Sequence, residues 1–155
     1  MLVADVMRTT VVVLPADMSP VDARQWLDHG HSRKGQRGQR LYPVVDEQGR
    51  LTGVMTRHRI AALASTDAPY KAAPVAAPVV AHPDETLRAV AERMATQNVS
   101  VLPVVERESG KLVGMLTTEN VLRGRARAHE RENEHERVRR LRIPFSRARS
   151  GANML

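Results

Sequence analysis

The stretch Val101-Leu-Pro-Val-Val105, followed by Gly110-Lys-Leu-Val-Gly-Met-Leu-Thr117, decides the fold, because the chain contains it twice. The earlier version is Leu41-Tyr-Pro-Val-Val45, followed by Gly49-Arg-Leu-Thr-Gly-Val-Met-Thr56. In each version two short apolar segments flank a turn that contains glycine, which predicts a β-hairpin. A unit that recurs at a fixed spacing predicts two copies of one structural motif.

The same order of elements is predicted around each hairpin. A short apolar stretch comes first, at Thr10–Leu14 and Val79–Ala81, and predicts a strand. Apolar residues then recur at helical spacing over Leu87–Met94, with a weaker version over Val21–Leu27. The candidate N-cap residues of these helices are Asp17 or Ser19 in the first copy and Asp84 or Thr86 in the second.

A second helix is predicted to follow each hairpin, directly after Thr56 and after Thr117. The later of these helices extends into the charged tail, from Thr118 as N-cap to about Arg142. The unit is therefore strand–helix–strand–strand–helix, which is too small to bury its sheet alone. Two copies packed face to face would bury it, so the predicted fold class is α+β, with two β-α-β-β-α repeats and a C-terminal charged helix.

The sequence predicts four segments. Residues 1–66 form the first repeat, and residues 67–78 form a linker rich in Ala and Pro. Residues 79–123 form the second repeat, and residues 124–155 form an Arg-rich helix and tail. The first copy also carries an insertion of about seven residues, within residues 30–39, that contains several basic side chains. We expect this insertion to be a solvated loop, with contact to a partner or a ligand phosphate as the alternative.

The net charge of +7 is mostly a property of the tail. Residues 1–122 carry 14 basic and 13 acidic side chains, whereas residues 123–155 carry 10 Arg and 4 Glu. The charge therefore says little about what the folded part binds. The chain has no cysteine, which excludes disulfides and zinc–sulfur sites and favours a cytoplasmic location. No run of 18 apolar residues is present, so no membrane-spanning segment is predicted.

These residues resemble a tandem pair of cystathionine-β-synthase-type (CBS) domains, known as a Bateman module. The resemblance rests on Asp5-Val-Met7 before the first copy, on Leu102-Pro-Val-Val105, and on the Gly-hydrophobic-x-Thr ending of each hairpin. It covers about Leu2–Arg123 and implies a pseudo-two-fold pair of repeats with two clefts. Such modules usually act as regulatory sensors of adenine nucleotides or related ligands rather than as enzymes, and many form dimers.

The family's hairpin ending continues as Thr/Ser-x-x-Asp. The Thr and the amides of the next helix can hold a phosphate, and the resemblance implies that the Asp accepts the ribose hydroxyls. This chain keeps Thr56 and Thr117 but has Arg59 and Asn120 at the Asp positions. Asn120 retains one acceptor oxygen, whereas Arg59 offers donors only and suits a phosphate or another anion.

We therefore expect the second-copy pair, Thr117 and Asn120, to form the better nucleotide site. The first-copy site is expected to be empty or to take a more anionic ligand. In the alternative interpretation both clefts are vestigial and the module is a dimerising scaffold.

The resemblance also implies which residues contact an adenine base. These are Thr10 and Val11 in the first copy and Ala77 and Pro78 in the second, where Pro78 lacks an amide hydrogen. Tyr42 in the first copy, and Ser100 and Pro103 in the second, are expected to line the clefts from the inner strands. Tyr42 either stacks on a base or packs in the core, and the sequence favours packing.

The sequence thus predicts a non-enzymatic, cytoplasmic module that senses AMP, ADP, ATP or another adenosyl ligand. Its expected partners are that nucleotide, a second copy of the chain, and a protein or membrane transporter that the module regulates. No metal site is predicted. One alternative is a regulatory fragment or relative of a chloride-channel-type membrane protein. The other is a basic adaptor that binds nucleic acid through its Arg-rich tail, which the near absence of aromatic residues disfavours.

Overall fold

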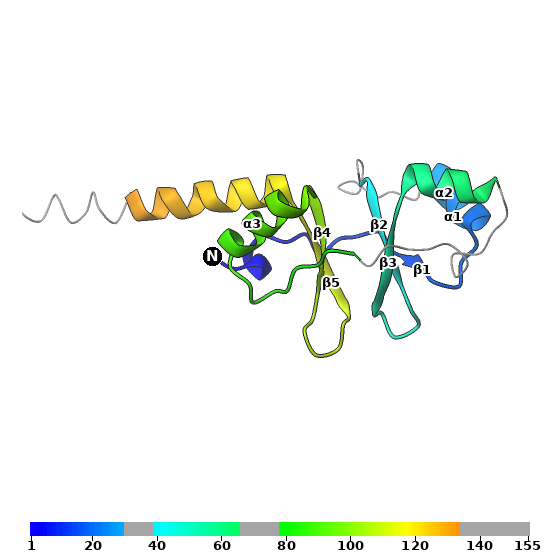
Figure 1. Cartoon of the computed structure of the whole chain (residues 1–155), viewed down its shortest axis with the longest axis horizontal. Helices are drawn as coiled ribbons and strands as arrows, with labels where there is room; N and C mark the ends of the chain where they lie inside the picture. The colour runs from blue at the N-terminus through cyan, green and yellow to red at the C-terminus, as the bar shows by residue number, and fades with distance from the viewer. Residues whose placement is uncertain (30–38, 66–77, 134–155) are drawn as a thin grey trace, which may run out of the picture.

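The computed structural model describes residues 1–29, 39–65 and 78–133. Two lobes follow each other along the chain, and each contains one β-hairpin (Figure 1). The first lobe consists of β1 (Leu14–Pro15), α1 (Pro20–Asp28), β2 (Leu41–Val45), β3 (Leu51–Thr56) and α2 (Arg57–Ala64). The second consists of α3 (Leu87–Gln97), β4 (Val101–Val105), β5 (Leu112–Thr117) and a helix over residues 118–133. The mixed α+β class is confirmed.

Three predicted segments extend beyond the described residues. These are the insertion, most of the linker and the tail after residue 133. The predicted helix through Arg142 is therefore described only over residues 118–133, which run outward past the second lobe (Figure 1). None of the described helices is long and apolar enough to cross a membrane.

The two hairpins pair their strands in matching register. In the first, Pro43 pairs with Val54, and in the second the corresponding Pro103 pairs with Met115. Both predicted hairpins are thus confirmed. The strands that precede them are shorter than predicted: β1 is limited to Leu14–Pro15, parallel to β2, and the second lobe has one parallel bridge, between Ala81 and Val104.

Hydroxyl side chains cap the helices. The Ser19 Oγ accepts a hydrogen bond from the Asp22 amide at 3.1 Å, and the Thr86 Oγ1 accepts one from Ala89 at 3.3 Å. These hydrogen bonds identify Ser19 and Thr86, rather than Asp17 and Asp84, as the N-cap residues. After β5 the cap is Thr117, which accepts from the Asn120 amide at 3.2 Å. The predicted N-cap, Thr118, is therefore wrong by one residue.

Each lobe has its own hydrophobic core. The first contains Leu14, Tyr42, Met55 and Ile60. The second contains Val3, Ala81, Leu87, Val90, Met94, Leu102, Val104, Leu116 and Val121. Val3 is fully buried there, so the first residues of the chain pack with the second lobe, although the sequence grouped them with the first repeat.

The lobes meet at equivalent points of their hairpins. The Leu51 amide donates to the Gly110 carbonyl at 3.1 Å, and the Leu112 amide donates to the Gly49 carbonyl at 3.0 Å. Both glycines have positive φ, 79° and 71°, as the turns require. Each repeat thus donates an equivalent backbone hydrogen bond to the other. The two repeats are therefore related by a pseudo-two-fold axis that passes between the hairpins.

Candidate ligand-binding site

A cavity of about 360 Å³ is lined by residues of both repeats. Its volume is within the range of small-molecule sites. The lining residues are Arg40, Leu41, Val54 and Thr56 from the first repeat, and Pro78, Val79, Asn98, Val99, Ser100, Val101, Leu102 and Pro103 from the second. Because most of these side chains are apolar, the cavity suits a flat, largely apolar group with a few polar contacts at its edges.

The first repeat supplies the polar end of the cavity. Thr56 lies where β3 ends and α2 begins, and its Oγ1 accepts a hydrogen bond from the Arg59 amide at 3.2 Å. The hydroxyl proton makes no other hydrogen bond within the described part of the chain, so it is available to a ligand acceptor. Arg40, exposed and directly before β2, adds a guanidinium to the same cavity.

The second repeat supplies the apolar walls. Leu102 and Pro103 in β4 are fully buried, so their positions are fixed by the core behind them. Both backbone groups of Ala81 bond to β4. Its amide donates to the Pro103 carbonyl at 3.0 Å, and its carbonyl accepts from the Val105 amide at 2.9 Å. The wall at Pro78 and Val79 is therefore held close to the strand that forms the adjacent wall.

The structure brings together four predicted site residues: Thr56, Pro78, Ser100 and Pro103. The sequence grouped candidates by copy, with Thr117 and Asn120 beside Ser100 and Pro103. The cavity instead combines the hairpin end of the first repeat with the inner strand of the second. This exchange follows from the pseudo-two-fold packing, which brings each hairpin to the other repeat.

Thr117 and Asn120 do not line this cavity and bond to each other. The Asn120 Oδ1 accepts from the Thr117 amide at 3.1 Å and from the Thr117 hydroxyl at 2.8 Å. The Thr117 Oγ1 in turn accepts from the Asn120 amide. The one acceptor oxygen on which the predicted ribose contact depends is thus already engaged, as in a capping box.

The remaining predicted residues lie outside the cavity. Tyr42 is 2% exposed in the core of the first lobe, where its hydroxyl donates to the Gln39 carbonyl at 3.0 Å. This burial favours the packed alternative over stacking on a base. Thr10 is exposed and Val11 is half-buried, and neither lies in a strand. Arg59 is exposed at the start of α2, and Ala77 lies outside the described residues.

Gln39 engages the backbone next to Val11. Its carboxamide accepts from the Val12 amide at 3.1 Å and donates to the Val12 carbonyl at 2.8 Å. The side chain thus takes the place of a neighbouring strand. Both backbone groups of Val12 are therefore already hydrogen-bonded. Val12 directly follows Val11, where the resemblance implied contact with an adenine base.

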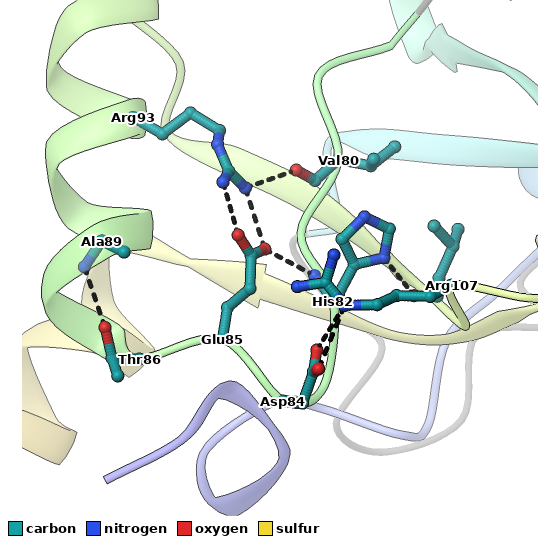
Figure 2. A network of polar contacts seen from close by, with 9 residues as sticks. Val80, His82, Asp84, Glu85, Thr86, Ala89, Arg93 and Arg107 are labelled. Atoms are coloured by element: carbon teal, nitrogen blue, oxygen red, sulfur yellow. Dashed lines mark hydrogen bonds and ion pairs between the residues drawn. The ribbon is translucent and has the colours of Figure 1, made fainter.

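Sequence reasoning did not identify the polar network behind the second-repeat wall. The Arg93 guanidinium binds both carboxylate oxygens of Glu85 and also donates to the Val80 carbonyl at 2.9 Å (Figure 2). The hydrogen bonds from Arg93 lower the pKa of Glu85 from 4.5 to about 2 despite partial burial. Since Val80 follows Pro78 and Val79, this pair fixes the backbone beside the cavity. An acid eight residues before an arginine has no distinctive pattern in the sequence.

Comparison with known proteins identifies the repeats. The family model described as "CBS domain" matches residues 3–65 and again residues 72–127. Among curated proteins, L-aspartate semialdehyde sulfurtransferase of Methanocaldococcus jannaschii is 37% identical over 82 residues, and the magnesium transporter MgtE of Thermus thermophilus is 40% identical over 81 residues. These matches cover 52% and 51% of this chain, but only 16% and 17% of the relatives.

Solved structures share the fold. The CBS domain pair of protein MJ0100, in complex with 5′-methylthioadenosine and S-adenosyl-L-methionine, is 29% identical with a TM-score of 0.62. The alignment covers 79% of this chain and 94% of that one. The cytosolic domain of the Mg²⁺ channel MgtE in complex with ATP is 28% identical with a TM-score of 0.60, covering 76% of this chain and 46% of that one.

Proposed function

Because this chain belongs to the CBS domain family, we propose that it is a regulatory module that binds an adenosyl ligand in the cavity between its repeats. The observation that carries the proposal is the cavity itself, which both repeats line with mostly apolar residues and to which the first repeat adds Arg40 and Thr56. The pairs from MJ0100 and MgtE, which bind adenosyl compounds, support the choice of ligand class.

The geometry suggests how the ligand is held. The base lies against the half-buried apolar residues of the second repeat, such as Val79, Val99 and Val101, and burial of its faces supplies the nonspecific part of the affinity. The polar remainder of the ligand extends toward Thr56, whose hydroxyl proton can donate to a phosphate or a ribose oxygen. The amides that begin α2 favour negative charge at the same place.

A ligand that touches both repeats can act as a signal. It binds best to one relative arrangement of the repeats and shifts the population toward that arrangement. A partner that contacts both repeats then responds to the change. The module itself needs no catalytic group for this role, so we propose a non-enzymatic regulator that acts in the cytoplasm, either alone or as part of a longer protein.

A second candidate role is control of ion transport. The match to MgtE, both as a sequence and as a cytosolic domain, favours a transporter as the regulated partner. The match to the sulfurtransferase favours an enzyme instead. Each relative is about six times longer than the stretch that it shares with this chain. The regulated partner therefore has to be identified by experiments on this protein itself. Self-association of the module is also proposed.

Isothermal titration with AMP, ADP, ATP, methylthioadenosine and S-adenosylmethionine tests the proposal. Thr56→Ala and Thr117→Ala form a matched pair, because both residues are N-caps at equivalent positions of the repeats. Each substitution should cost about 1 kcal/mol of stability. Only Thr56→Ala should weaken binding. Loss of binding in Thr117→Ala alone would move the site to the other cleft, and no binding of any ligand at millimolar concentration would reject the proposal.

A further inference from the structure

Charge is distributed unevenly around the cavity. Among the described residues that line it, Arg40 is the one charged group, and none is an aspartate or a glutamate. Arg40 forms no ion pair with any residue that the structure describes. A guanidinium without a carboxylate partner at the edge of an apolar cavity is suited to bind an anionic group with two parallel hydrogen bonds.

The N-terminus of α2, which begins directly after Thr56, adds to this positive charge. The first turn of α2 holds Arg57, His58 and Arg59 and contains no acidic residue. Helices usually favour acidic side chains in the first turn, because the helix dipole places positive charge there. None of the three basic side chains of this turn lines the cavity, and the Arg57 guanidinium donates to the Tyr42 hydroxyl at 3.2 Å. The groups that favour an anion at the polar end are therefore Arg40, Thr56 and the positive end of the α2 dipole.

The second repeat contributes a different kind of lining. Asn98 ends α3 with a positive φ of 52°, and the carbonyls of Met94 and Ala95 accept hydrogen bonds from the Val99 and Asn98 amides. After this cap the lining is formed by Val99, Val101, Leu102 and Pro103, which are apolar, and by Ser100, which adds a hydroxyl. This part of the lining gives apolar surface for a base, and none of its described residues is a carboxylate that could neutralise a cationic ligand.

The resemblance implies an acidic residue three positions after Thr56 and after Thr117, and this chain has an acidic residue at neither position. Arg59 occupies one, and Asn120 occupies the other with its acceptor oxygen bonded to Thr117. Neither can compensate a positive charge on a ligand. A ligand that carries a sulfonium would therefore meet the positive charge of Arg40, and no carboxylate among the described lining residues would offset it.

We propose that the cavity selects among adenosyl ligands by charge, binding a phosphorylated nucleoside and rejecting a sulfonium-bearing one, with Arg40 as the residue that determines this specificity. The inference rests on the proposed function, since it concerns the same cavity. The phosphate lies toward Arg40 and Thr56, and the base lies toward the second repeat.

Titration of three ligands of different charge tests the inference: AMP, which is anionic, methylthioadenosine, which is neutral, and S-adenosylmethionine, which carries a net positive charge. The intact chain should bind AMP at least about tenfold more tightly than methylthioadenosine, and S-adenosylmethionine most weakly. Arg40→Gln should remove about tenfold of the AMP affinity and leave methylthioadenosine within about twofold.

Arg50→Gln is the matched control. It removes one positive charge from the same repeat, but Arg50 lies outside the cavity and pairs with Asp46 at 2.8 Å. It should change none of the three affinities. Equal affinity for AMP and methylthioadenosine, or an Arg40→Gln variant that weakens both equally, would overturn charge selection while leaving adenosyl binding intact. Failure of all three ligands to bind would overturn the proposed function as well.

Discussion

The carbonyl oxygen of Arg8 lies directly against Gly114, so closely that a Cβ on this glycine would come within 2.7 Å of it. Arg8 and Met115 exchange two backbone hydrogen bonds at this point, of 2.8 and 2.9 Å. The N-terminal segment therefore extends the sheet of the second repeat. The absence of a side chain at Gly114 is what permits this approach.

Gly114→Ala is expected to destabilise the fold by about 1 to 3 kcal/mol, because the obstructing atom belongs to the backbone and has no rotamer with which to move aside. The free energy of unfolding in urea measures the loss. Hydrogen exchange of the Met115 amide should also accelerate, since its acceptor is the Arg8 carbonyl.

Gly110→Ala is the control for this substitution. Gly110 has nothing within 4 Å of an added Cβ, but its φ of +71° costs an alanine about 1 kcal/mol. It should therefore lose stability without faster exchange at Met115. Equal stability of Gly114→Ala and the unsubstituted chain would show that the N-terminal segment is not held as described.

Gly124 gives a contrasting case within the helix over residues 118–133. A Cβ there would lie 2.7 Å from the Leu87 Cδ1 and 2.8 Å from the Val6 Cγ1, which are ends of side chains. Gly124→Ala gains about 1 kcal/mol of helix propensity, which offsets part of the crowding. We expect a net loss of stability within about 1 kcal/mol, smaller than for Gly114→Ala.

Ala126→Gly isolates the propensity effect for this comparison, because Ala126 is exposed in the same helix. It should lose about 1 kcal/mol in thermal or urea unfolding. If Gly124→Ala is less stable than the unsubstituted chain by several kcal/mol, the Leu87 and Val6 side chains cannot adjust. The helix would then pack more rigidly on the N-terminal segment than we expect.

The repeat made most of the fold predictable. Apolar spacing identified α3, and the doubled hairpin identified β2 to β5, because these patterns depend on residues close together in the sequence. The strand pairing of residues 10–14 was overestimated, since the Gln39 carboxamide satisfies Val12 where a longer strand was expected. A side chain that replaces a strand leaves no periodic pattern in the sequence.

The candidate site was less predictable, because its residues come together through packing between repeats. Thr56, Pro78, Ser100 and Pro103 lie in the lining of one cavity, whereas the sequence assigned Thr56 to a different cleft from the other three. Which hairpin reaches which inner strand depends on the pseudo-two-fold axis, and no local pattern specifies that axis. Arg40 was named among the basic residues of the insertion, with contact to a ligand phosphate only as the alternative, because its sequence context does not distinguish it from the other basic residues there.

The Glu85–Arg93 pair supplies a pH-dependent part of the stability. Glu85 has a side chain only 11% exposed and holds Arg93 with both oxygens, while the neighbouring Asp84 is 65% exposed and pairs with Arg107 (Figure 2). The pKa of Glu85 is lowered from 4.5 to about 2 in the folded state. Its stabilising effect is therefore complete above pH 4.5 and is lost as the pH falls toward 2.

Glu85→Gln should accordingly lower the free energy of unfolding by about 2 kcal/mol at pH 7, because the amide cannot hold the guanidinium as an ion pair. The deficit relative to the unsubstituted chain should shrink steadily when urea unfolding is repeated at pH values from 5 down to about 2.5. Asp84→Asn, the exposed counterpart, should cost less than about 1 kcal/mol at pH 7. A Glu85→Gln deficit that stays constant over this pH range would show that the carboxylate charge contributes nothing, and that Glu85 acts only through its shape and hydrogen bonds.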